Sequence, residues 1–128
     1  MIVADSSALV LAVADTTERG EQVRSRLAEG AIAPHLIDAE VGHAVRGLVR
    51  RGLLDADAAV RSLRAAEHLV LDRFPHPPLR PRAWELRDNL SFYDGLYVAL
   101  SERTDLALLT ADVKLSAAPG PRCVVGLV

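Results

Sequence analysis

The chain has 128 residues, which is enough for one domain (residues 1–128) with its own core. Half of it is apolar and its net charge is −2, so it lacks the strong positive charge of a protein that holds nucleic acid by charge alone. No early apolar run is long enough to cross a membrane, no basic segment suggests a secretory signal, and one cysteine excludes an internal disulfide or a Cys-based metal cluster. We expect a cytoplasmic protein without membrane contact.

The first half of the chain alternates short apolar runs with longer segments of helical periodicity. Gly30 and Gly52 are suitable helix ends, and Ser7 is a suitable cap for the first helix. The pattern predicts a strand at 2–4, a helix from Ser7 to about 13, a helix over 16–30, a strand at 31–34 and a helix over 35–52.

The second half continues this alternation. It predicts a helix over 55–69 capped by Asp55, a strand over 69–74, a proline-rich loop over 74–81, helices over 82–90 and 91–104, a strand over 106–110, a short helix over 112–118 and a last strand over 123–128. Strands that alternate with helices favour the α/β class, with a parallel sheet covered by helices on both faces.

Four acidic residues occupy unusual positions in this scheme. Asp5 and Asp112 follow the carboxyl ends of two predicted strands, so a parallel sheet would bring them to one edge. Glu40 flanks the apolar stripe of its helix, and Asp94 lies in the first turn of a helix that is apolar nearly all round. All four carboxylates therefore lie beside core-forming residues.

Such carboxylates cannot share a pocket without compensation, since two charges about 4 Å apart repel by roughly 4 kcal/mol at an effective dielectric near 20. Either some are protonated or a cation joins them. A set of oxygen ligands without histidine or cysteine favours Mg²⁺ or Mn²⁺ over Zn²⁺. The sequence therefore suggests a magnesium or manganese site formed by Asp5, Glu40, Asp94 and Asp112.

Each acid also has a purely structural interpretation. Asp94 fits a capping box with Ser91, Glu40 suits an ion pair with Arg46 or another neighbour, and Asp5 and Asp112 suit turns or caps. The remaining polar and aromatic residues carry less information. Ser7 and Thr110 can orient a carboxylate or cap a helix; the four histidines, which lack metal spacing or a partner, are interpreted as structural or solvent-facing, and the three residues Trp84, Tyr93 and Tyr97 as core.

Several segments resemble one known family, the PIN-domain nucleases. "MIVADSSALV" is similar to the opening strand of that family, and "PHLIDAEVGHAVRGLVRRG" is similar to its acidic helix. "YDGLYVAL" followed by "LALLTADVKL" resembles the C-terminal half of the VapC toxins, which belong to the family. The resemblance covers essentially the whole chain in order and length, and its last two segments are the most specific.

The resemblance implies a PIN-like three-layer α/β/α fold and a divalent-metal endoribonuclease that leaves 3′-hydroxyl and 5′-phosphate ends. It implies a VapC-type toxin that forms a homodimer and is inhibited by a VapB-type antitoxin. The family's acidic set falls on Asp5, Glu40, Asp94 and Asp112, with Ser7 and Thr110 in support. Gly95 replaces a usual alanine, which we expect to loosen the helix start by up to about 1 kcal/mol.

Three alternatives remain open at the level of sequence. A receiver-like signalling domain also combines an α/β fold, strand-end acids and Mg²⁺, but it would need an acidic pair after the first strand and would leave Glu40 unexplained. A noncatalytic binding module would not need all four acids. A housekeeping PIN nuclease without a toxin role would share every one of these residues.

Overall fold

The computed structural model describes all residues, 1–128. The chain forms five strands and seven helices, which follow in the order β1 (Ile2–Ala4), α1 (Ser6–Ala14), α2 (Glu18–Arg26), β2 (Ala31–Pro34), α3 (Leu36–Arg50), α4 (Ala56–Leu69), β3 (Val70–Phe74), α5 (Arg80–Glu85), α6 (Phe92–Thr104), β4 (Leu108–Thr110), α7 (Val113–Ala117) and β5 (Val125–Leu127).

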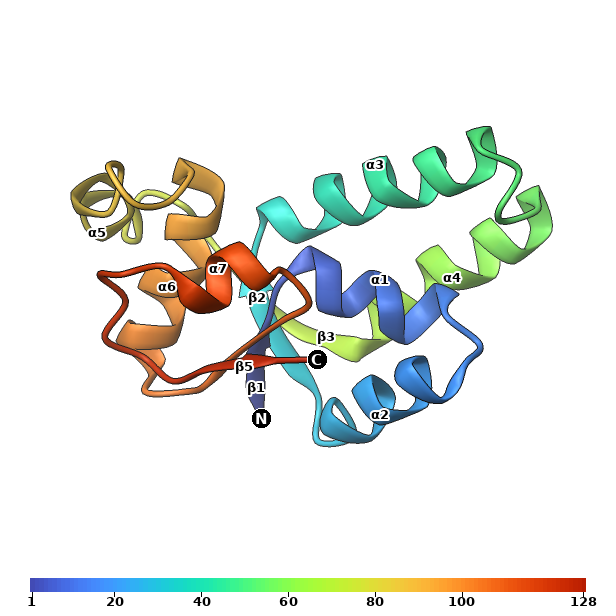
Figure 1. Cartoon of the computed structure of the whole chain (residues 1–128), viewed down its shortest axis with the longest axis horizontal. Helices are drawn as coiled ribbons and strands as arrows, with labels where there is room; N and C mark the ends of the chain where they lie inside the picture. Colours follow the sequence, from blue (N-terminus) through green and yellow to red (C-terminus); the bar gives the residue numbers. More distant parts are fainter.

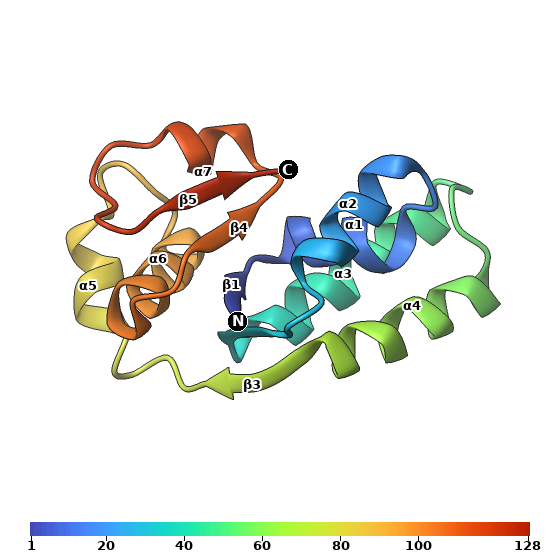
Figure 2. The same cartoon turned by 90° about the horizontal axis from the view of Figure 1, so that it is seen from below.

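The strands form one sheet in the order β3-β2-β1-β4-β5, and every neighbouring pair is parallel. Figures 1 and 2 show α1 to α4 gathered on one side of the sheet and α5 and α6 on the other, while α7 lies beside β4 and β5. The predicted parallel sheet with helices on both faces is confirmed. None of the helices combines the length and the apolar character that a membrane crossing requires.

The strand order reverses between β1 and β4. From β1 the chain proceeds to β2 and β3 on one side, and it then crosses to β4 and β5 on the other. Val3 and Ala4 pair with Leu108 and Leu109, so the two strands end side by side. In open α/β sheets this reversal leaves a crevice beyond the carboxyl ends of the strands, where ligands bind.

One helix start differs from the expected cap, and another is completed by a distant side chain. Helix α1 is capped by Asp5, not by Ser7, because Asp5 Oδ1 accepts the Ala8 N–H at 2.9 Å. Helix α3 has no cap of its own; instead the His76 ring nitrogen Nε2 accepts the Leu36 N–H at 3.0 Å. His76 therefore has a structural partner that the sequence did not suggest. The predicted Asp55 cap of α4 is confirmed, since its carboxylate accepts the Ala58 N–H.

Several helix boundaries also differ from the prediction. Helix α5 begins at Arg80, inside the expected loop, because Pro81 fits the first turn of a helix, where its missing N–H has no partner to lose. It ends at Glu85, and residues 86–89 continue as turns. Helix α2 ends at Arg26 instead of extending to Gly30, which adopts a positive φ of 85° just before β2.

Helix α6 is packed almost completely into the core, as its apolar sequence predicted. Seven consecutive residues, 95–101, are buried. Gly95 has a specific reason to be glycine, since a β-carbon there would lie 3.0 Å from Ala83 Cα and 3.1 Å from the Ala83 carbonyl oxygen. The glycine thus allows α5 to approach the first turn of α6, a role beyond the loosening that the sequence suggested.

The prediction that three aromatic residues belong to the core holds for one of them. Tyr97 is 1% exposed, whereas Trp84 and Tyr93 are 60% and 59% exposed. Both lie near the junction of α5 and α6, on positions that helical periodicity left undecided.

Candidate active site

Asp5 lies at the end of β1 and is almost completely buried. Its Oδ1 accepts hydrogen bonds from Ser7 Oγ at 2.7 Å and from the Ala8 N–H at 2.9 Å, and its Oδ2 accepts one from Thr110 Oγ1 at 2.5 Å. A carboxylate oxygen can accept two hydrogen bonds, so Oδ2 retains one free position. The side chain is held in one orientation with that position available.

Ser7 and Thr110 connect the ends of β1 and β4. Ser7 Oγ also accepts the Ala111 N–H at 2.8 Å, and Thr110 Oγ1 accepts the Asp112 N–H at 2.9 Å. Each hydroxyl therefore donates to Asp5 and accepts from the segment that follows β4. The two residues orient a carboxylate, as the sequence suggested, but neither caps a helix, because Asp5 caps α1 and Asp112 caps α7.

Asp112 caps α7 with one oxygen. Its Oδ1 accepts the Lys114 N–H at 2.8 Å and the Leu115 N–H at 3.4 Å, whereas Oδ2 accepts no hydrogen bond. The cap thus leaves one carboxylate oxygen of Asp112 uncommitted, and Thr110 places this residue next to Asp5.

Glu40 is held by a residue from a distant part of the chain. The hydroxyl of Tyr97, from α6, donates a hydrogen bond of 2.6 Å to Glu40 Oε1, from α3, while Oε2 accepts none. The expected ion pair between Glu40 and Arg46 is not formed. Burial, followed by the contact with Glu40, raises the pKa of Tyr97 well above its usual value, so this hydroxyl stays a donor.

Asp94 forms one half of the expected capping box. Ser91 Oγ accepts the Asp94 N–H at 3.0 Å, but the Ser91 N–H does not bind the Asp94 carboxylate in return. The carboxylate is half-buried at the start of α6 and is not consumed by backbone capping. Both interpretations of this residue are therefore compatible with the structure.

The four carboxylates affect one another electrostatically. Burial is the main cause that raises the pKa values of Asp5, Glu40 and Asp94. Negative neighbours add to it: Asp112 raises the pKa of Asp5, Asp5 and Asp94 raise that of Glu40, and Asp5 and Asp112 raise that of Asp94. The structure thus brings the four predicted acids into one region of negative potential.

No group of three or more His, Cys, Asp or Glu side chains is arranged so that it could hold a metal ion by itself. Each of the four acids nevertheless has at least one oxygen with hydrogen-bonding capacity to spare, and all four side chains are carboxylates. This set suits a hard divalent cation that retains several waters better than it suits zinc. The roles of these residues in binding or catalysis stay predictions.

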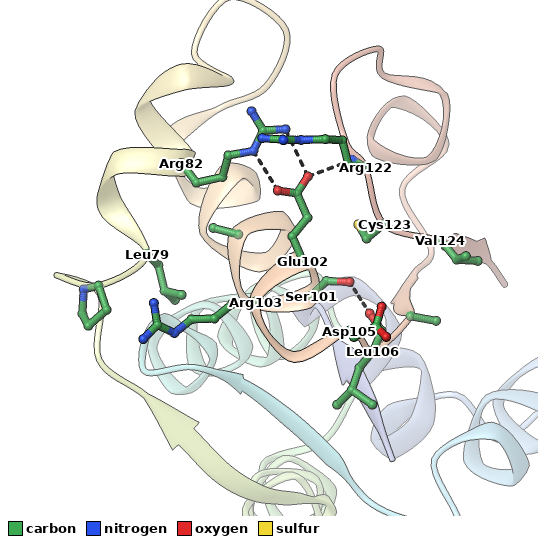
Figure 3. A pocket seen from close by; sticks show the side chains of 13 residues that line it. Leu79, Arg82, Ser101, Glu102, Arg103, Asp105, Leu106, Arg122, Cys123 and Val124 are labelled. Atoms are coloured by element: carbon green, nitrogen blue, oxygen red, sulfur yellow. Dashed lines mark hydrogen bonds and ion pairs between the residues drawn. The ribbon is translucent and has the colours of Figure 1, made fainter.

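A separate hollow of about 540 Å³ lies at the other end of α6 and contains none of these acids. Figure 3 shows Glu102 within it, bound by Arg82 from α5 through two hydrogen bonds of 2.7 and 3.1 Å and by the Arg122 N–H at 2.8 Å. Burial raises the pKa of Glu102, but these hydrogen bonds outweigh it and hold the pKa below its usual value. This cluster fixes α5 against α6 and the C-terminal segment.

Tyr97 is the site residue that sequence reasoning missed. Its position three residues after Asp94 places both on one helical face, and a buried tyrosine hydroxyl normally needs a hydrogen-bond partner. These two signals point toward the acids, but the sequence could not identify which acid would accept the bond.

Curated relatives match nearly the whole chain. Ribonuclease VapC1 of Mycobacterium tuberculosis H37Rv is 44% identical over 128 residues, which cover 98% of this chain and 96% of the relative. Ribonuclease VapC9 of the same organism is 38% identical and is matched over 100% of this chain and 98% of its own length. A family model described as PIN domain matches residues 2–121.

Two crystal structures share the fold at lower sequence identity. PAE2754 from Pyrobaculum aerophilum superposes with a TM-score of 0.74 at 24% identity, covering 97% of this chain and 81% of that one. VapC20 of Mycobacterium tuberculosis, a Sarcin-Ricin loop cleaving toxin, superposes with a TM-score of 0.67 at 19% identity, covering 91% and 94%. Fold, order of motifs and relatives agree, and the chain belongs to the PIN-domain family and, within it, to the VapC ribonucleases.

Proposed function

We propose that this protein is a metal-dependent endoribonuclease and the toxin of a VapBC toxin–antitoxin module. The observation that carries the proposal is the position of Asp5 and Asp112 at the reversal of strand order, in electrostatic contact with Glu40 and Asp94. The ribonuclease names of relatives that are 38–44% identical over nearly the full chain support RNA as the substrate. Asp5, Glu40, Asp94 and Asp112 would hold Mg²⁺ or Mn²⁺.

A bound divalent ion would lower the pKa of a coordinated water and neutralise charge that develops on the scissile phosphate. Neighbouring side chains of the protein keep the carboxylates in a fixed orientation. Ser7 and Thr110 keep Asp5 in one orientation, and Tyr97 keeps Glu40 in one orientation. The free oxygens of these acids would bind the cation, and partial burial would strengthen its attraction.

The same proposal includes the partners that the family membership suggests. A VapB-type antitoxin would inhibit cleavage by placing a positively charged side chain among the four acids, where a guanidinium can replace the charge of the cation. Two copies of the 13.8 kDa chain would form a homodimer. Addition of the antitoxin should abolish RNA cleavage, and sedimentation should give twice the mass of one chain; continued cleavage or a monomer would contradict these parts.

The decisive experiment compares cleavage of defined RNAs by the wild type, Asp5→Asn and Asp94→Asn in Mg²⁺, Mn²⁺ or chelator. We expect cleavage only by the wild type with metal, and a loss of at least about a hundredfold in both variants, because each loses a charged ligand. Asn can still cap a helix, so Asp5→Asn should remain folded.

A matched control is Asp55→Asn, which changes a capping carboxylate of α4 that has no contact with the four acids. It should cleave RNA at the wild-type rate. Wild-type cleavage by Asp94→Asn, or undiminished cleavage in chelator, would show that the proposed roles are wrong.

A further inference from the structure

The aromatic residues of this chain are few and unusually placed. There are five in total, one Trp, two Tyr and two Phe. Three of them are exposed at the junction of α5 and α6: Trp84 at 60%, Tyr93 at 59% and Phe92 at 37%. Together these three residues form what we call the aromatic surface. Exposing large apolar side chains together indicates a surface that contacts another molecule.

The aromatic surface lies at the helix turn that carries one of the four acids. Phe92 and Tyr93 directly precede Asp94 in the first turn of α6. Trp84 reaches this turn because Ala83, its neighbour in α5, packs against Gly95, the residue after Asp94. A ligand on the aromatic surface therefore lies against the first turn of α6, which carries Asp94.

The surroundings of the aromatic surface offer positive charge. A hollow of about 530 Å³ is lined by Trp84 and Phe92 together with Arg80 and Pro81. The Arg87 guanidinium lies 5.0 Å from the centroid of the Trp84 ring. Neither Arg80 nor Arg87 forms an ion pair, and the nearby Glu85 is already bound by Arg82, which leaves Asp88 as the one free acid on this segment.

The Arg87 guanidinium donates a hydrogen bond of 3.0 Å to the Trp84 carbonyl oxygen, and neither it nor Arg80 is neutralised by a carboxylate. Exposed aromatic rings beside such guanidinium groups are features that bind single-stranded nucleic acid. Bases stack on the rings with little regard to sequence, and arginine attracts the phosphates that join them. A purely apolar partner would leave both arginines without compensation. The chemistry of this surface therefore favours an unpaired polyanion with planar groups over an apolar protein segment.

We propose that the aromatic surface stacks unpaired bases of the RNA substrate next to the scissile phosphate. This inference rests on the proposed ribonuclease function and specifies which side chains of this protein hold the bases beside the cut. Trp84 supplies the main stacking ring, Phe92 and Tyr93 extend the surface toward Asp94, and Arg80 and Arg87 contact the phosphates.

Trp84 is the sole tryptophan of the chain, so its fluorescence reports on this surface alone. The test titrates Asp94→Asn protein, which should hold RNA uncleaved, with a short single-stranded RNA and with an abasic oligonucleotide of equal charge. We expect the RNA to quench the fluorescence and the abasic oligonucleotide to leave it nearly unchanged, because stacking needs a base. Equal quenching by both, or none by either, would overturn the proposal.

A second test introduces Trp84→Leu, which keeps apolar bulk but removes the aromatic face, in the otherwise wild-type protein. Base stacking is strong enough that its loss should raise the KM for single-stranded RNA about tenfold or more. The control is Leu53→Ala, which alters an exposed apolar side chain, 67% accessible, in the turn between α3 and α4. Its KM should equal that of the wild type.

The aromatic surface could instead contact a second copy of the chain, and sedimentation distinguishes this from RNA binding. If Trp84→Ala sediments as a smaller species than the wild type, this surface is a contact between copies and the proposal is wrong. An unchanged KM in Trp84→Leu would also overturn it while leaving the ribonuclease function intact. Absence of RNA cleavage by the wild type would instead remove the proposed function on which the inference rests.

Discussion

At the level of single residues, a carboxylate that caps a helix can still keep one oxygen free for a cation. Asp112 caps α7 with Oδ1 and leaves Oδ2 free. Asp5 caps α1 with Oδ1 and retains capacity on Oδ2. Because the capping oxygen and the free oxygen are separate atoms, the same contacts that begin a helix also fix the direction of a carboxylate.

Tyr97 provides the sharpest test at this scale. Tyr97→Phe removes the hydrogen bond to Glu40 and should cost about 1.5–3 kcal/mol of unfolding free energy, the range for a bond to a charged group. Because the Glu40 carboxylate then loses its fixed orientation, the apparent affinity for Mn²⁺ should fall by roughly 10–100-fold. Denaturant unfolding and Mn²⁺ titration of the folded protein measure the two effects.

The matched control for Tyr97→Phe is Tyr93→Phe, whose hydroxyl is exposed and makes no hydrogen bond within the chain. Tyr93→Phe should change neither the free energy of unfolding nor the affinity for Mn²⁺. An unchanged Mn²⁺ affinity in Tyr97→Phe would mean that the tyrosine supports the fold without positioning Glu40.

At the level of elements, the contact between α5 and α6 shapes the rim of the site. Helix α5 is short, but the pair of hydrogen bonds between Arg82 and Glu102 ties it to the far end of α6. The Ala83–Gly95 contact ties it to the first turn, beside Asp94. Two attachments, one at each end of α6, hold α5 in a single position.

Gly95→Ala tests this arrangement. The added methyl group gains up to about 1 kcal/mol of helix propensity, but it meets two backbone atoms of Ala83 at 3.0–3.1 Å in a helix that cannot move freely. Overpacking of this kind costs about 1–3 kcal/mol, so we expect a net loss of stability in denaturant unfolding.

Gly47→Ala is the matched control, because it also lies inside a helix but has no neighbour within 4 Å of the added carbon. It should gain stability by the propensity difference, about 1 kcal/mol at most. A similar gain in Gly95→Ala would show that α5 yields to the new methyl group.

At the level of the whole molecule, the buried acids of the site lower the stability of the folded protein at neutral pH. The pKa values of Asp5, Glu40 and Asp94 are raised mainly by burial and also by one another. In the pH range above their ordinary values of 3.8 and 4.5, the folded state therefore binds more protons than the unfolded state. Its stability falls as pH rises through the raised pKa values.

The metal-free protein should consequently become more stable when the pH is lowered from 7 toward 5. Below about pH 4 the gain should end, because Glu102 and Asp15 have lowered pKa values and lose their favourable contacts on protonation. Thermal unfolding in chelator at several pH values measures this trend.

Asp94→Asn should flatten the pH dependence and raise Tm at pH 7 by about 4 °C, the change that roughly 1 kcal/mol produces in a domain of 128 residues. A stability of the wild type that rises steadily from pH 5 to 7 would contradict the assigned pKa directions.

How much of the structure the sequence predicts differs between these scales. Alternation of apolar runs and helical segments was sufficient for the parallel sheet, because period and strand length depend on local sequence. The four acids stood out because each lies beside core residues or at a strand end. The boundaries of α5 and the exposure of Trp84 were missed, since both depend on how α5 packs against α6.

The sequence by itself determined the class of fold and the family, and it singled out four carboxylates as the predicted site, because all of this follows from local patterns and from motifs in order along the chain. Only the tertiary structure decided which side chains hold those carboxylates. Thr110 reaches Asp5 across 105 positions of sequence, and Tyr97 reaches Glu40 across 57. Such contacts depend on strand order and helix packing, which place distant residues together and leave no trace in the local pattern.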